Sequence, residues 1–271
     1  MLKTHRKFVK YLLHRSAMKS GLWWMGLFLW MPAASQAASW ALSMEGFYGD
    51  MSFASDQNAS AVELRRTDDA RRSVFGRVER TRKFDQSATG GGMGVAFPIA
   101  LPRSAVAFSV SGAPNQDIVP LSIVDTSFIH DPAGWLETVM RYRFAHYAIS
   151  NIHLISPTII WMPRPWLQGS AAYYWTLTDF LGGATVPNHS VSTRWLVRPV
   201  RWAHPWAAYT RSEESFEAGA GATREFSAHH YLAGVQMPLS PRWELHPSFE
   251  YERRSNKQIL RTGAMSVTLR W

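Results

Sequence analysis

Residues 243–252 read Trp-Glu-Leu-His-Pro-Ser-Phe-Glu-Tyr-Glu, a stretch in which apolar and polar side chains alternate without a break. Successive side chains of a β-strand point to opposite faces, so this period of two predicts a strand with one apolar and one polar face. Residues 167–178 and 263–271 alternate in the same way. The apolar face of the last stretch includes Trp271, the final residue of the sequence.

Similar alternating segments recur along the chain, separated by turn-forming residues. They lie near residues 39–48, 60–67, 73–84, 89–99, 103–112, 118–129, 134–147, 151–161, 166–178, 189–198, 204–213, 225–238, 242–253 and 258–271. Their lengths suit the roughly 9–11 residues that a tilted strand needs to cross a bilayer. We therefore expect an all-β, antiparallel, up-and-down transmembrane barrel of about 12–14 strands.

The connections between these segments alternate between short turns and longer polar loops, as in bacterial outer-membrane barrels. The short ones are 130–134, 162–165 and 238–241, and the long ones are 50–59, 179–188 and 211–225. A soluble secreted β-sandwich would also alternate. The terminal aromatic residue favours the barrel, because it resembles the C-terminal signature by which outer-membrane proteins are recognised for insertion. Closure is also required, because a bilayer offers no hydrogen-bond partners to an open sheet edge.

The first 37 residues predict a cleaved export signal, followed by a barrel domain over residues 38–271. Six Lys and Arg residues precede the apolar run 21–31, and Ser35-Gln36-Ala37 fits the small-x-small rule for cleavage between Ala37 and Ala38. An N-terminal anchor helix is the alternative. Removing the signal leaves 23 basic against 20 acidic residues, so the high positive charge is no sign of a nucleic-acid partner. The absence of cysteine excludes a lipid anchor at the cleavage point.

These patterns predict a location in the outer membrane of a Gram-negative bacterium. The expected partners are the outer-membrane lipids, including lipopolysaccharide, and the barrel assembly machinery during biogenesis. A further partner from an envelope or polysaccharide system is possible, but the sequence does not identify it. We expect no nucleic-acid partner.

Five stretches resemble the YaiO family of outer-membrane barrels. They are residues 141–147 (Arg-Tyr-Arg-Phe-Ala-His-Tyr), 152–157, 166–179, 231–243 and 251–254. The resemblance covers about half of the chain and implies an outer-membrane barrel. It carries over no active site.

Two arginines in the first of these stretches are candidates for the lining of the lumen. Arg141 and Arg143 share one strand face, and the opposite face is apolar. If they point inward, they can meet inward acids such as Glu250 or Glu252. Two interpretations follow: an ion-pair network that plugs a small barrel, or a charged lining that selects anionic solutes.

One segment resembles a catalytic motif. Residues 143–151 are similar to the Arg-x-x-His-x-Ser-Asn pattern of the PagL lipid A deacylases, with His146 and Ser150 in place of the base and the nucleophile. Two extra residues separate them, which on a continuous strand places them on one face but about 13 Å apart. A bend near Ala148 would be needed to bring them together. We favour an interfacial histidine and a turn serine over catalysis.

No other motif indicates a reaction, a metal or a cofactor. The glycine run 90–92 lacks the Gly-Lys-Ser/Thr of a phosphate-binding loop, and the adjacent His229 and His230 lack metal-ligand spacing. We therefore expect an outer-membrane component of the cell envelope without enzymatic activity, a metal or a cofactor. A narrow porin-like channel and the deacylase are the alternatives.

Overall fold

The computed structural model describes residues 39–52, 55–68, 72–83, 85–113, 119–181, 183, 185–219 and 222–271, with the side chains of 214–225 also outside the description. The expected signal and its cleavage point at Ala37 and Ala38 lie outside the described residues. Within the described residues, no helix is long and apolar enough to cross a membrane.

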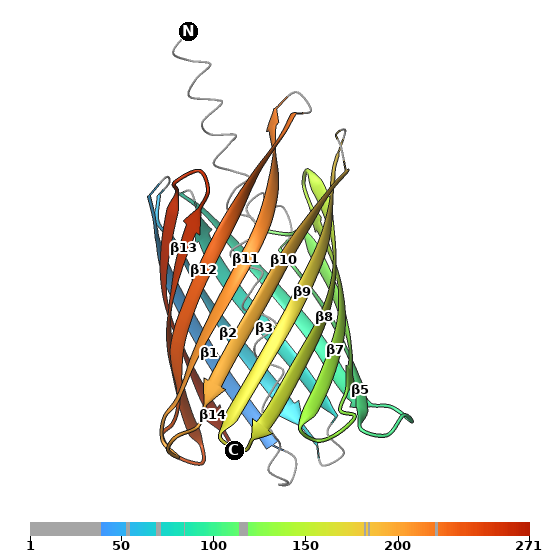
Figure 1. Cartoon of the computed structure of the whole chain (residues 1–271), viewed down its shortest axis with the longest axis vertical. Coiled ribbons are helices and arrows are strands. Elements are labelled where there is room, and N and C mark those ends of the chain that lie inside the picture. Colours follow the sequence, from blue (N-terminus) through green and yellow to red (C-terminus); the bar gives the residue numbers. More distant parts are fainter. Residues whose placement is uncertain are drawn as a thin grey trace.

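The described chain forms fourteen antiparallel strands that close into a single barrel (Figure 1). They are β1 (Ser39–Met51), β2 (Gln57–Thr67), β3 (Ser73–Lys83), β4 (Gln86–Pro98), β5 (Ser104–Gly112), β6 (Ser122–His130), β7 (Leu136–Tyr147), β8 (Ser150–Arg164), β9 (Leu167–Phe180), β10 (Thr185–Val197), β11 (His204–Gly219), β12 (Ala222–Pro238), β13 (Trp243–Arg254) and β14 (Ile259–Arg270). The expected all-β barrel is confirmed, and the strand number falls at the top of the expected range.

Each strand pairs with its neighbours in the chain, and β1 pairs with β14 to close the sheet. Ser43 and Thr268 share a side-chain hydrogen bond of 3.0 Å across that closure. Because the strand number is even, β1 begins and β14 ends at the same rim, the lower one in Figure 1. We call this the lower rim and the opposite one the upper rim.

The two faces of the sheet follow the alternation in the sequence. On β13, Phe249 points outward and is 52% exposed, whereas the adjacent Glu250 points inward and is 7% exposed. Glu252, two residues on, is also buried inside the barrel. The apolar face is therefore on the outside of the barrel. The polar face lines the lumen, where charged side chains can pair with one another.

Two of the expected long loops are largely strand. Residues 211–225 form the upper part of a hairpin, because β11 continues to Gly219 and β12 starts at Ala222. In the same way β9 and β10 extend into residues 179–188. These hairpins rise above the other strands at the upper rim (Figure 1). The backbone hydrogen bonds of a strand at the rim need no apolar face beside them, so polar residues do not end a strand there.

Candidate functional site in the barrel lumen

The first inward cluster joins β6 and β7. Arg141 Nε lies 2.9 Å from both carboxylate oxygens of Asp125, and Arg143 Nε lies 2.7 Å from one of them. Asp125 and Arg143 are register partners and both are buried. The two arginines do face the lumen, but their partner is Asp125 and not Glu250 or Glu252. One carboxylate thus holds two guanidinium groups.

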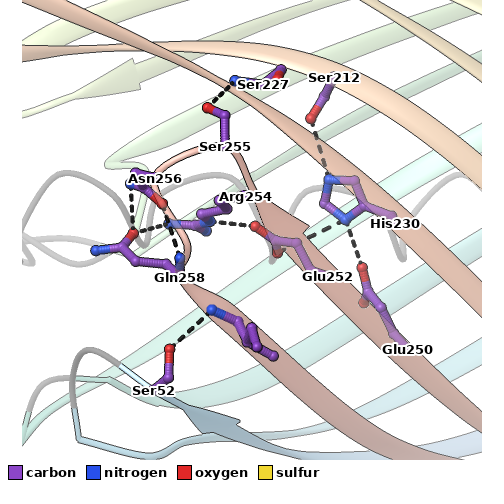
Figure 2. A network of polar contacts seen from close by, with 11 residues as sticks. Ser52, Ser212, Ser227, His230, Glu250, Glu252, Arg254, Ser255, Asn256 and Gln258 are labelled. Atoms are coloured by element: carbon purple, nitrogen blue, oxygen red, sulfur yellow. Dashed lines mark hydrogen bonds and ion pairs between the residues drawn. The ribbon is translucent and has the colours of Figure 1, made fainter.

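The second inward cluster joins β11, β12 and β13 and contains both of the expected glutamates (Figure 2). His230 Nδ1 lies 2.9 Å from Glu250 Oε1 and 3.8 Å from Glu252 Oε2. On the other side of the ring, Nε2 lies 3.2 Å from Ser212 Oγ. Arg254 Nε donates to Glu252. All five side chains are buried, so the cluster ties three neighbouring strands together from the inside.

This cluster has the hydrogen-bond order of a serine, a base and an orienting acid. Ser212, His230 and Glu250 line the lumen cavity described below, but Ser212 itself is only 2% exposed and offers little surface to an acyl ester. The donor atoms of His230, Glu250 and Glu252 also lie within 4.8 Å of one another, a spacing that a metal ion could bridge. Arg254 Nε already binds Glu252 Oε1, and its positive charge opposes a metal ion on the same carboxylate. We therefore interpret the cluster as a structural ion-pair network.

The lumen also contains a cavity of about 490 Å³. Although the charged clusters lie close by, part of the cavity wall is apolar. The apolar residues are Ile129, Val139, Ile152, Leu154, Leu196 and Trp206. The same wall carries Arg141 and Arg143 on one side and Arg194 and Arg198 on another. The cavity thus combines apolar surface with four guanidinium groups against three carboxylates (Glu213, Glu244 and Glu250), and this excess of positive charge suits an anion with an apolar part.

Arg194 and Arg198 are the most distinctive residues of this cavity. The Arg194 guanidinium lies 4.5 Å above the centre of the Trp206 ring, and its Nε is buried without a hydrogen-bond partner among the described residues. Arg198 Nη2 donates to Gln168 Oε1 at 2.9 Å. Within the described part of the chain, neither arginine pairs with a carboxylate. Arg194 as a whole is half-buried, but a buried Nε with an unsatisfied donor is costly, and an anionic ligand on the exposed part of the guanidinium would offset part of that cost.

Neither arginine was among the lumen residues expected from the sequence. They lie four residues apart in the predicted segment 189–198, on the polar face of its alternation. That pattern could have placed them in the lumen. It could not have shown that no acid faces them, because this depends on which strands lie opposite.

The structure separates His146 from Ser150. The chain does turn at residues 148–149, but the turn makes Tyr147 the partner of Ser150 and His146 the partner of Asn151. His146 therefore lies on the outer face, where its Nδ1 is 2.7 Å from Asn151 Oδ1, whereas Ser150 points inward and is buried. Side chains on opposite faces of a sheet cannot form a base and its nucleophile, so this geometry does not support the deacylase alternative.

Trp271 lies at the lower rim beside the start of β1. Its backbone nitrogen and oxygen both bond to Trp40, at 3.0 and 2.9 Å, and its side chain is 55% exposed. Its role in recognition during insertion stays a prediction.

No family model and no curated protein match the chain. Solved structures do match. A loop L8 deletion mutant of OmpT, an outer membrane protein of Vibrio cholerae, is 10% identical, with 87% of this chain and 100% of that one covered and a TM-score of 0.53. An anion-selective porin from Comamonas acidovorans is 9% identical, with 87% and 99% covered and a TM-score of 0.52.

A bacterial polysaccharide outer membrane secretin is 8% identical, with 88% of this chain and 100% of that one covered and a TM-score of 0.55. The chain has the fold of outer-membrane β-barrels. At these identities the likeness concerns the fold and leaves the role open.

Proposed function

We propose that this protein is a bacterial outer-membrane barrel whose lumen binds a small anion with an apolar part and forms a narrow passage for it. The observation that supports this most directly is Arg194, a half-buried arginine on the cavity wall whose Nε is buried without a hydrogen bond and which lacks an acidic partner among the described residues. The ligand's charged group would bind Arg194 and Arg198. Its apolar part would pack on the wall around Leu196 and Ile152.

We also propose that the protein is exported with a signal removed after Ala37 and is related to the YaiO family. The family resemblance is supported by strand-level similarities on β7, β8, β9, β12 and β13. An envelope role without enzymatic activity, expected from the sequence, stays a prediction.

The test uses the refolded barrel and octanoate as the probe. Calorimetry should show saturable octanoate binding, and planar bilayers should show a small, anion-preferring conductance that octanoate blocks. Arg194→Gln should weaken octanoate binding by about ten- to a hundredfold, because a hydrogen bond to a charged group contributes about 1.5–3 kcal/mol. Arg66→Gln, which changes an outward arginine near the lower rim, should leave octanoate binding unchanged.

Absence of octanoate binding, or equal binding by the wild type and Arg194→Gln, would refute the lumen site. Octanoate binding without any conductance would refute the passage. Each readout is interpretable only for folded protein, which unboiled samples of a barrel reveal by their altered migration on a gel.

A further inference from the structure

The outer wall of β11–β13 carries a row of three tyrosines. Tyr209 is the register partner of Tyr231, and Tyr231 is the register partner of Tyr251. Their ring centres lie 5.4 and 6.4 Å apart. Aromatic rings with a polar tip favour the boundary between hydrocarbon and headgroups, so this row marks the upper edge of the membrane on these strands.

A cationic row lies two residues further toward the upper rim on the same three strands. Arg211 faces His229 across β11 and β12, and His229 faces Arg253 across β12 and β13. Both arginines are exposed on the outer face, and neither forms an ion pair or a side-chain hydrogen bond with a described residue. Neighbouring strands lie about 4.8 Å apart, so the row presents positive charge over roughly 10 Å of the wall.

His229 is held in place by the tyrosine row. Its Nδ1 lies 2.8 Å from the Tyr209 hydroxyl, and the two rings stack with their centres 6.1 Å apart. When the hydroxyl donates to Nδ1, the neutral imidazole carries its proton on Nε2. That nitrogen can then donate to an acceptor between the two arginines.

The same tyrosine–histidine pair occurs on two other hairpins, in different surroundings. Tyr142 pairs with His153, and Tyr173 pairs with His189, with hydroxyl-to-Nδ1 distances of 2.9 and 2.5 Å. His153 Nε2 lies 3.7 Å from a carboxylate oxygen of Asp179. The register partners of His153 are Phe144 and Leu177, so arginines do not flank this histidine as they flank His229. The Tyr142–His153 pair without flanking arginines can therefore be compared with the Tyr209–His229 pair that has them.

We propose that the cationic row binds the phosphate groups of a glycolipid in the outer leaflet, with the acyl chains lying on the apolar wall below the tyrosine row. The row lies seven residues above the lower end of β11, nine above that of β12 and ten above that of β13, close to the roughly 9–11 residues that cross the hydrocarbon layer. Its side chains are therefore at the depth of the lipid phosphates. The width of the row suits a headgroup with more than one phosphate. This site lies on the outside of the barrel and is independent of the proposed lumen pocket.

The test is lipid retention by the refolded full-length barrel, measured by native mass spectrometry with bisphosphorylated lipid A, dephosphorylated lipid A and phosphatidylglycerol as separate probes. The wild type should retain bisphosphorylated lipid A preferentially. Arg211→Gln combined with Arg253→Gln should lower its retention about tenfold or more, since a cation near an anionic surface contributes about 1 kcal/mol. Arg80→Gln, an exposed outward arginine on β3, is the matched control and should retain lipid A as the wild type does.

Three results would overturn the proposal: equal retention by the double variant and the wild type, an equal loss in Arg80→Gln, or equal retention of the dephosphorylated lipid. Preference for phosphatidylglycerol would overturn the choice of a glycolipid. If the double variant does not fold, Arg211→Lys with Arg253→Lys keeps the charge and should keep lipid A retention. Loss of lipid A from that folded variant would also contradict a site based on charge.

Discussion

Replacing Asp125 by asparagine should destabilise the barrel by about 3 kcal/mol. The change removes one buried negative charge that two guanidinium groups share. The Arg143 side chain is 4% exposed and cannot turn to water, whereas the Arg141 side chain is 19% exposed and partly can. Loss of one partner from a buried ion pair costs about 3–5 kcal/mol, and we expect the lower end because the asparagine oxygen still accepts one hydrogen bond.

The assay is reversible unfolding by guanidinium chloride in lipid vesicles, followed by the fluorescence of the barrel's tryptophans. Asp131→Asn is the control, because Asp131 pairs with Arg103 at 2.7 Å in an exposed turn, where such a pair contributes less than about 1 kcal/mol. Adding Arg143→Met to Asp125→Asn should recover part of the loss. Equal losses for Asp125→Asn and Asp131→Asn would refute the reasoning that the lumen cluster is buried and interdependent.

Three further predictions concern processing, assembly and catalysis. N-terminal sequencing of protein purified from membranes should begin at Ala38, and a retained first residue would contradict cleavage after Ala37. Trp271→Asp should lower the yield of folded protein in the outer membrane and leave unfolded chains in the periplasm, measured by fractionation at native expression levels; unchanged assembly would count against a recognition role. His146→Ala and Ser150→Ala should leave the lipid A profile of expressing cells identical to that of the wild type, because the two side chains lie on opposite faces; a changed profile in either folded variant would reopen the deacylase alternative.

The strands were predictable because one face of the sheet is apolar and the other is polar. Apolar and polar residues therefore alternate along each strand. Phe249 and Glu250 show the principle: adjacent residues of β13 differ sharply in exposure, as their alternation indicates. The upper hairpins were less predictable. Polar residues above the membrane fit a loop and a strand equally well, so the segment 211–225 gave no sign that β11 and β12 continue through it.

The contacts inside the lumen could not be predicted from the alternation. The period of two places Arg143 and Glu250 inside the barrel, but strand order and register decide which inward residues meet. Asp125 lies directly opposite Arg143 on the next strand, whereas Glu250 lies several strands away around the wall. The faces on which His146 and Ser150 lie depend on the length of the turn between their strands. This turn consists of two residues, 148 and 149, and its length does not follow from the alternation.

The pairing of β1 with β14 is the seam of this barrel, the one place where strands far apart in the sequence meet. Every other pairing joins strands adjacent in sequence, so hairpins can form locally, whereas Ser43 and Thr268 are separated by 225 positions when they meet. The chain-entropy cost of that meeting grows only with the logarithm of the loop length, and the preceding hairpins shorten the effective loop further. Since Trp40 and Trp271 already bond to each other, a short linker could join the two ends, and a circular permutant opened at another turn of the lower rim would move the seam without changing the wall.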